Sequence, residues 1–155
     1  MTDPLVRLGH VHLKVRDLAR AVAFYTGVLG LRVTEELDGT FAFLSSGDSH
    51  HELALQEVGA DAPRPPRGAT GLFHVAFEAP DPTAFARALT ALRDAGQDLT
   101  AVDYGISWAL YTADPDGHGV EVYLDTRRAA GGRERWHGRT APLDDATVLQ
   151  AARTN

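Results

Sequence analysis

The feature that most constrains this chain is an internal repeat. His10 and His74 lie 64 positions apart, and the same offset separates Asp17 from Asp81, two residues that each stand just before a predicted helix. The start of each half therefore repeats in register as a strand, a histidine and a helix cap. This repeat predicts two related modules arranged in tandem.

The first module is predicted to fold as β-α-β-β-β. Apolar and polar residues alternate in "LGHVHLKV", which is typical of a strand with one buried face. Asp17 is the expected N-cap of a helix that Gly30 ends. The apolar face of that helix is Leu18, Val22, Tyr25 and Leu29. The segments "LRVTEEL", "TFAFLSS" and "HELALQEV" then follow as three strands separated by turn residues.

The second module repeats the order. "LFHVAFEAPD" is a strand that ends in the N-cap Asp81, and Pro82 suits the first helical position. Gly96 closes a helix whose apolar face is Phe85, Ala88, Leu89 and Leu92. The strands "DLTAVD", "SWALYTA" and "GVEVYL" complete it, so the predicted fold class is α+β with two tandem βαβββ modules.

The boundaries follow from composition. Module one is expected over residues 8–58, a Pro- and Gly-rich linker over 59–70, and module two over 71–125. Together they form one predicted domain, residues 1–125. The tail, residues 126–155, begins as a basic loop. It ends in a short predicted helix, for which Leu143, Val148 and Leu149 are available for docking.

Charge and composition narrow the function. The net charge of −6 argues against nucleic-acid or anionic-membrane binding, which both favour a basic face. The chain has no cysteine, so a metal site would use nitrogen and oxygen ligands. No stretch resembles a signal peptide or a membrane span, and a cytoplasmic enzyme or binding protein is the expectation.

Three residues suggest a metal centre. His10 and His74 begin equivalent strands, and Glu121 lies among apolar residues of the last strand, where a buried carboxylate needs a partner. Any one of them alone would more often be an ordinary strand residue, but together they form a two-histidine, one-carboxylate set. Such a set leaves open positions on Fe(II), with Mn(II) or another divalent cation as competitors.

These residues also carry a family resemblance. The segments "GHVHLKVRDLARAVAFYTGVLGL", "GLFHVAFE" and "YTADPDGHGVEVY" closely resemble the vicinal oxygen chelate superfamily, which includes glyoxalases, bleomycin-binding proteins and type I extradiol dioxygenases. The resemblance covers Leu8 to about Asp125. It implies a partly open mixed β-barrel of paired modules around one metal, with the helices outside and His10, His74 and Glu121 as ligands.

Within that superfamily, the sequence motifs of this chain most resemble the catechol 2,3-dioxygenase-like branch. The resemblance implies His51, in "HHELAL", as the acid/base and Tyr111 as a second catalytic residue, ten positions before Glu121. A hairpin that turns at "DPDGH" would place Tyr111 opposite Glu121 on one face. The implied reactants are a catechol-type diol and O2, and a homodimer is the expected assembly.

Two points stay open in the sequence. Strict alternation in "HHELALQE" sends Glu52, rather than His51, to the barrel face, where Glu52 would be a fourth ligand as in glyoxalase-like members; a β-bulge near Ser49–His51 would restore His51. His12, Tyr104 and Trp108 are candidate substrate-binding residues, although the core suits Trp108 better. Tyr104 replaces a histidine that is usual in the dioxygenase branch, where it helps to hold oxygen. One alternative is a glyoxalase-like isomerase or lyase. The other is a non-catalytic drug-binding protein, against which the set His10, His74 and Glu121 argues.

Overall fold

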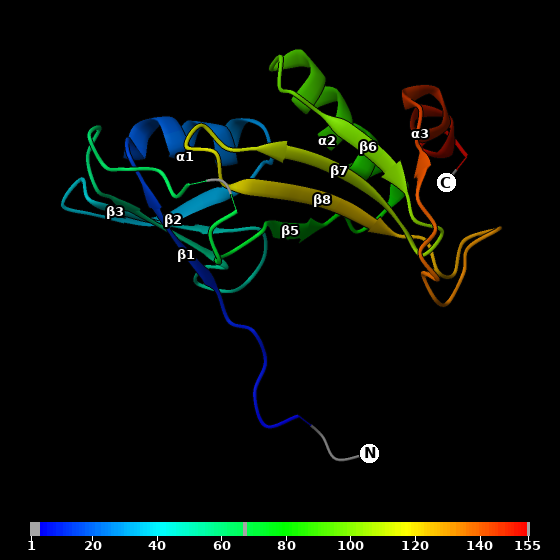
Figure 1. The fold of residues 1–155 in the computed structure, drawn as a ribbon, viewed down its shortest axis with the longest axis horizontal. Coiled ribbons are helices and arrows are strands. Elements are labelled where there is room, and N and C mark those ends of the chain that lie inside the picture. The colour runs from blue at the N-terminus through cyan, green and yellow to red at the C-terminus, as the bar shows by residue number, and fades with distance from the viewer. Residues whose placement is uncertain (1–3, 67, 155) are drawn as a thin grey trace. The chain divides into compact units, whose positions relative to one another are not determined.

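A computed structural model describes residues 4–66 and 68–154 of the chain. It divides into two compact units, Met1–Arg67 and Gly68–Asn155, and each is described here by itself. Both units combine one sheet with helices on one of its faces (Figure 1), so the α+β class expected from the sequence is confirmed.

Unit one contains a four-stranded sheet and one helix. Its elements are β1 (Val11–Val15), α1 (Leu18–Gly27), β2 (Arg32–Leu37), β3 (Phe41–Ser45) and β4 (Leu53–Glu57). The strand order is β1-β4-β3-β2, with β1 parallel to β4 and the other pairs antiparallel. The first and last strands of the repeat therefore lie side by side at one end of the sheet.

The alternation predicted for the first strand is confirmed. Leu13 and Val15 are buried, whereas His12 and Lys14 are exposed. Asp17 caps α1 by accepting a hydrogen bond from the Arg20 N–H at 2.8 Å. The buried face of α1 differs from the prediction: it is Leu18, Ala21, Phe24 and Tyr25, while Val22 and Leu29 are only half-buried.

Unit two repeats this plan and extends it. Its elements are β5 (Val75–Glu78), α2 (Pro82–Asp94), β6 (Thr100–Asp103), β7 (Ser107–Ala113), β8 (Gly119–Asp125), β9 (Ala141–Pro142) and α3 (Asp145–Ala151). The strand order is β5-β8-β7-β6-β9, and β5 is parallel to β8. Strand β9, which the sequence did not predict, pairs with the outer edge of β6.

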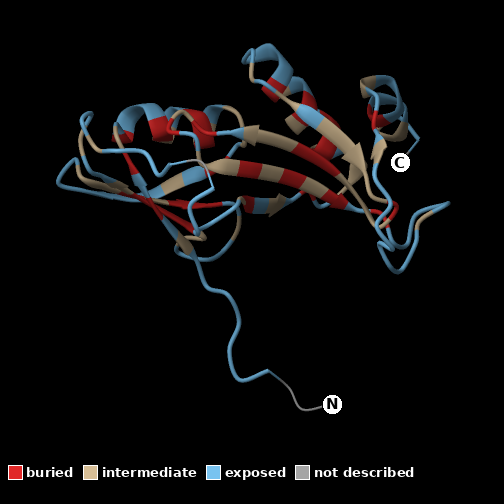
Figure 2. Cartoon of the chain, viewed as in Figure 1, coloured by how far each residue is buried: buried red, intermediate tan, exposed pale blue. Residues whose placement is uncertain are grey.

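Helix α2 covers one face of this sheet. Asp81 caps it at the Ala84 N–H, Pro82 is its first residue, and Gly96 follows it with a φ of 66°. The Gln97 N–H donates to the Leu92 carbonyl, so Gly96 supplies the left-handed residue of a closing turn, as predicted. Buried and half-buried residues alternate along β8 (Figure 2), which shows that its buried side faces α2.

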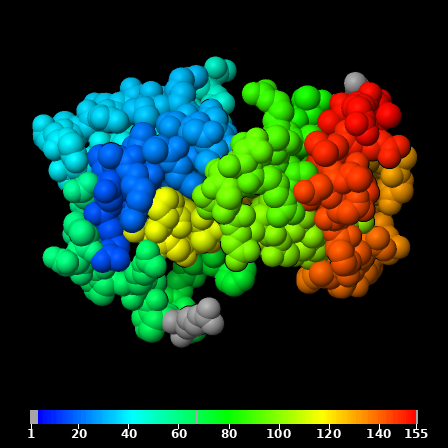
Figure 3. Space-filling model, turned by 90° about the horizontal axis from the view of Figure 1, so that it is seen from above, coloured from blue at the N-terminus to red at the C-terminus, as the bar shows by residue number. Residues whose placement is uncertain are grey.

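The tail is part of unit two. Figure 3 shows it, in orange and red, lying against the green residues of that unit, and α3 packs on α2. Leu143 and Val148 are buried as predicted, whereas Leu149 remains 42% exposed. Among the described residues, no helix has the length and apolar character needed to span a bilayer.

Candidate metal centre

Glu121 lies at the centre of a polar cluster on the face of unit two opposite α2. Its neighbours along β8, Val120 and Val122, are buried on the helix side, so alternation directs the carboxylate to the other face. The Tyr111 hydroxyl donates to Glu121 Oε1 at 2.9 Å. His74 Nε2 lies 2.8 Å from Glu121 Oε2. The acid is therefore contacted by an imidazole at one oxygen and a phenol at the other.

Strand register produces this arrangement. In the antiparallel pair β7–β8, Tyr111 is directly opposite Glu121, so the predicted hairpin geometry is confirmed. In the parallel pair β5–β8, Ala76 is the partner of Glu121. His74, two residues before Ala76, shares the face of that residue and lies just ahead of the strand.

The turn between β7 and β8 fixes the start of β8. The buried Asp114 carboxylate accepts hydrogen bonds from the Asp116 and His118 N–H groups, and His118 Nδ1 lies 2.8 Å from its second oxygen. Gly119 follows, and a Cβ at this position would lie 2.3 Å from the Phe73 carbonyl oxygen. Only glycine permits this close approach, which brings the backbone before His74 against β8.

Burial and hydrogen bonding set the protonation state of Tyr111. Burial raises the pKa of this phenol most, and its bonds to Tyr104 and Glu121 raise it further. Tyr111 is therefore a protonated hydrogen-bond donor at any ordinary pH. The buried Nδ1 of His74 has no hydrogen-bond partner among the described residues, so the contact with Glu121 is the polar contact that holds this ring.

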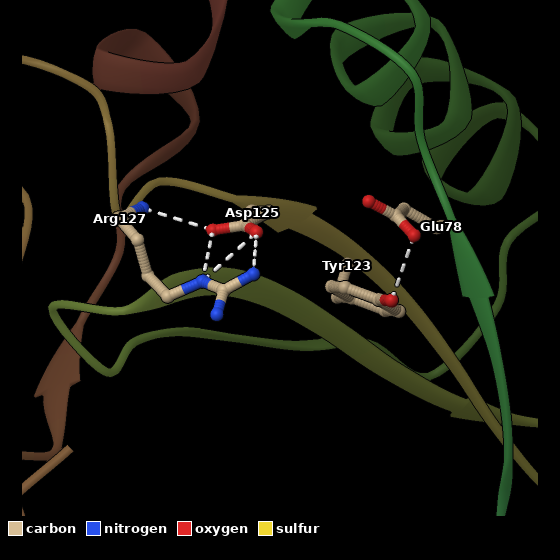
Figure 4. Close-up of polar contacts among 4 residues, drawn as sticks. All are labelled: Glu78, Tyr123, Asp125 and Arg127. Atoms are coloured by element: carbon tan, nitrogen blue, oxygen red, sulfur yellow. Dashed lines mark hydrogen bonds and ion pairs between the residues drawn. The ribbon is translucent and has the colours of Figure 1, made fainter. Parts of the chain in front are cut away.

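Other acids beside Glu121 have different partners. The Tyr123 hydroxyl donates to Glu78 at 2.9 Å. The Arg127 side chain donates several hydrogen bonds to the Asp125 carboxylate (Figure 4). The Arg127 side chain lowers the pKa of Asp125 to about 2. Asp125 is paired with a cationic side chain, whereas Glu121 contacts a phenol and an imidazole and keeps a carboxylate oxygen next to a nitrogen donor.

In unit one, His10 lies beside His51. Their ring centroids are 4.6 Å apart, and the His51 ring also contacts Phe43 at 4.9 Å. Nδ1 of His51 lies 2.9 Å from Nδ1 of His50. Burial, followed by the nearby His10 and His50, lowers the pKa of His51, so this ring is neutral at pH 7 and has a lone pair to accept a proton.

Glu52 is held by the loop that precedes β4. Its Oε2 accepts from the Ser46 N–H at 2.8 Å and from the Ser46 hydroxyl, and its Oε1 accepts from the Ser49 hydroxyl. Although burial opposes the shift, the serine hydrogen bonds lower the pKa of Glu52. This carboxylate is ionised, and loop serines contact both of its oxygens.

The repeat therefore differs from the sequence expectation at its last strand. In unit one, Ala54 pairs with His12, and in unit two Glu121 pairs with Ala76, the counterpart of His12. Ala54, not Glu52, is thus the structural equivalent of Glu121. The predicted alternation does not apply to His51 and Glu52, because β4 begins only at Leu53 and both residues lie in the preceding loop. The register shift in this sheet falls between Val33 and Glu35 of β2, and not at Ser49–His51.

The three candidate substrate-binding residues lie in three different environments. Tyr104 contacts Tyr111, with ring centroids 6.4 Å apart, and so borders the cluster around Glu121. His12 is exposed on unit one, with its ring 6.2 Å from that of Phe41. Trp108 lies on the opposite face of the sheet, against Phe85 of α2. Its position three residues before Tyr111 requires this by strand alternation, and we leave Trp108 out of the proposed site.

The donors in each unit fit a cation only in part. Within neither unit do the described residues gather three His, Asp or Glu side chains into a group that could hold a metal. His74 Nε2 and Glu121 Oε2 nevertheless face one another at 2.8 Å, and one nitrogen and one oxygen donor suit a divalent ion. Among its described residues, unit two therefore provides two converging donors, one short of a three-ligand group.

Two tandem βαβββ units, each with a histidine just ahead of its first strand, define the fold class of this chain. The chain belongs to the glyoxalase/bleomycin resistance protein/dioxygenase superfamily, whose sequence model matches residues 7–122. The predicted vicinal oxygen chelate resemblance is thereby confirmed. The matched residues include His10, His51, His74, Tyr111 and Glu121, and exclude the tail.

Individual relatives include more than one activity. The chain is 35% identical over 128 residues to a catechol-2,3-dioxygenase of Bacillus subtilis, covering 83% of this chain and 45% of that protein. It is 33% identical to biphenyl-2,3-diol 1,2-dioxygenase 3 of Rhodococcus globerulus, covering 77% of this chain and 63% of the relative. A crystal structure of lactoylglutathione lyase from Agrobacterium tumefaciens matches with a TM-score of 0.60 and 26% identity, over 83% of this chain and 100% of that one. The chain thus spans about half to two thirds of the dioxygenases.

Proposed function

We propose that this chain is a metal-dependent extradiol-type dioxygenase that cleaves a catechol-type vicinal diol with O2. The observation that carries the proposal is the convergence of His74 Nε2 and the Tyr111 hydroxyl on the two oxygens of Glu121. The similarity to a catechol dioxygenase and a biphenyl-diol dioxygenase supports the aromatic diol as the substrate class.

The proposed ligands are His10, His74 and Glu121, with Fe(II) as the preferred ion and Mn(II) or another divalent cation as competitor. His10 would supply the donor that unit two lacks. The proposal includes a homodimer as the assembly, with the modules paired within one chain or exchanged between chains. Glu52 is not part of the set, because loop serines contact both its carboxylate oxygens.

Each remaining residue has a defined task in this proposal. When bound, the cation would hold both diol oxygens and lower the pKa of the substrate hydroxyl groups. His51, neutral because its pKa is lowered, accepts a substrate proton and later returns it. Tyr111, protonated because its pKa is raised, donates its one hydroxyl proton to Glu121 Oε1 and so keeps this carboxylate oriented. Tyr104 stands beside Tyr111, at the position where the dioxygenase branch usually has a histidine.

A lactoylglutathione lyase-like activity is the second candidate. It is favoured by the similarity to the Agrobacterium lactoylglutathione lyase, which is 26% identical with a TM-score of 0.60. A second carboxylate ligand would support this reading, but the register places Ala54 at that position. A drug-binding role without catalysis is the third candidate, and it requires no bound metal.

Elemental analysis of the purified protein, followed by oxygen uptake with a panel of catechols, tests the proposal. We expect bound or readily bound Fe(II) and catechol-dependent oxygen consumption, and both should be lost in His74→Ala. Lactoylglutathione formation without oxygen uptake would replace the dioxygenase with the lyase. Failure to bind any divalent ion would favour the binding protein. A His74→Ala variant with full metal content would refute the ligand assignment.

A further inference from the structure

The tail carries an aromatic residue to the edge of the cluster around Glu121. The Trp136 ring lies edge-to-face on Tyr104, with centroids 5.9 Å apart and an interplanar angle of 86°. Tyr104 meets Tyr111 in the same way, at 6.4 Å and 80°. Both contacts fall within the range of favourable aromatic pairs, about 4.5–7 Å between centroids. Three rings therefore form a continuous row that ends at the proposed metal ligand.

The backbone around Trp136 is fixed on both sides. Before it, the Arg133 N–H donates to the Gly105 carbonyl at 2.9 Å. After it, Arg139 forms an ion pair with Asp103 at 3.1 Å, and Ala141 pairs with Asp103 in the β9–β6 ladder. Gly105 allows this packing, because a Cβ there would lie 2.9 Å from Arg139 Cδ. The tail is thus anchored to the β6–β7 turn, beside Tyr104.

The indole of Trp136 is placed but not covered. Its Nε1–H donates to the Arg139 carbonyl, which satisfies the one polar atom of the ring. The residue nevertheless remains 50% exposed. The other tryptophan, Trp108, packs against Phe85 on the helix face. An exposed aromatic surface whose polar group already has a partner favours contact with a flat apolar group.

We propose that Trp136 and Tyr104 form an aromatic wall that stacks against the ring of the substrate and selects aromatic diols over aliphatic ones. This inference rests on the proposed function, because it assigns the ring-binding part of the same site. Trp136 lies in the tail, beyond residues 7–122, which the superfamily model matches, whereas Tyr104 lies within them. Trp136 is a specificity residue in this proposal, and the chemistry stays with the metal ligands, His51 and Tyr111.

Tryptophan fluorescence tests the contact directly and does not require turnover. The chain has two tryptophans, so Trp108→Phe leaves Trp136 as the single reporter, and Trp136→Phe leaves Trp108. We expect titration with catechol under nitrogen to quench the Trp108→Phe protein saturably and to leave the Trp136→Phe protein no more quenched than free N-acetyltryptophanamide. Equal behaviour of the two variants would overturn the proposal.

Affinity separates a ring contact from a general role in folding. In the metal-loaded full chain, Trp136→Ala should weaken catechol binding about tenfold, the loss of about one aromatic stacking contact. It should leave binding of acetohydroxamate, a chelator with two oxygens and no ring, unchanged. Leu149→Ala, which truncates another exposed tail residue, is the matched control and should change neither. Equal weakening of both ligands by Trp136→Ala would mean that the residue only supports the tail.

The two proposals can fail independently. Saturable quenching of Trp136 by catechol without oxygen uptake would reject the dioxygenase and keep the aromatic wall. Oxygen uptake that is unchanged in KM by Trp136→Ala, with no quenching, would keep the dioxygenase and reject the wall. Absence of catechol binding in every assay would reject the wall together with the proposed substrate.

Discussion

Within each unit, the first and last strands of the repeat lie side by side, but the two units have different side chains at equivalent positions of these strands. In unit two, the row across β5, β8 and β7 is Ala76, Glu121 and Tyr111. In unit one, the row across β1, β4 and β3 is His12, Ala54 and Phe43. The acid and its phenol partner in one unit are thus replaced by a methyl group and a phenyl ring in the other.

This difference shows how a repeated fold can produce an unequal ligand set. Both units keep a histidine immediately before the first strand, His10 and His74, so each offers one imidazole. On the adjacent strand, unit two has the carboxylate of Glu121 at the position where unit one has Ala54. A centre built from both units would have two nitrogens and one carboxylate, which leaves positions open for a chelating substrate and O2. A second acid at Ala54 would occupy one of those positions.

The largest effect is expected from replacing Glu121, the carboxylate that stands where unit one has Ala54. Glu121→Gln keeps the shape of the side chain but removes its charge, so we expect metal affinity to fall by more than about a hundredfold, because loss of an outer-shell partner alone costs about 10–100-fold. Oxygen uptake with catechol should fall with it. Metal content by elemental analysis and oxygen-electrode rates measure both effects.

Glu52→Gln is the matched control in the other unit. This carboxylate accepts hydrogen bonds from Ser46 and Ser49 rather than from a histidine. We expect unchanged metal content and a small loss of stability, since an amide still offers one acceptor oxygen to the loop. A loss of metal as large as that of Glu121→Gln would show that Glu52 is a ligand, as in a glyoxalase-like centre.

The sequence was most informative where regular strands and caps determine the geometry. Tyr111 and Glu121 flank a short turn at equal distances along alternating strands, so their pairing was predictable. The caps Asp17 and Asp81 were predictable from residue type and position. The same alternation places Trp108 and Tyr111 on opposite sides, and the position of Trp108 against Phe85 agrees with the core position that the sequence favoured for it.

The sequence was least informative where the chain leaves a regular strand. Residues 46–52 form an irregular loop, so counting alternate residues back from Leu53 does not determine the environment of Glu52. Ser46 and Ser49 donate local hydrogen bonds to Glu52, and the periodicity of a sequence does not predict such bonds. Trp136 was missed as a site residue because its contact with Tyr104 depends on β9 adding to the edge of β6, and two-residue strands have no sequence pattern of their own.

A smaller effect is expected from exchanging the residues opposite the acid position. Tyr111→Phe removes the donor to Glu121 Oε1, and we expect kcat to fall about tenfold to a hundredfold, in the range of a lost outer-shell or proton-donating group. Phe43→Tyr adds a hydroxyl opposite Ala54 and beside the His51 ring, but it leaves Glu121 with its donor, so it should lower kcat less than Tyr111→Phe does. Steady-state kinetics on metal-loaded proteins compare them, and equal losses in the two variants would contradict the special role of unit two.

The smallest effect concerns the helix caps, where the two units are most alike. Asp17 and Asp81 each accept a hydrogen bond from the third helical N–H, at 2.8 and 2.7 Å. Replacing an N-cap by alanine costs about 1 kcal/mol of unfolding free energy. Asp81→Ala should lose this amount in full, because α2 has no acid in its first turn.

Asp17→Ala should lose less, because α1 has a second acid at the same end. Glu57, from the end of β4, accepts a hydrogen bond from the Leu18 N–H at 2.8 Å, and its charge still opposes the positive end of the helix dipole after Asp17 is removed. Urea denaturation of both variants measures the difference. Asp17→Ala combined with Glu57→Gln should exceed the sum of the single losses, since each acid compensates for the other. Strict additivity would show that Asp17 and Glu57 act independently and that Glu57 does not compensate for the loss of Asp17.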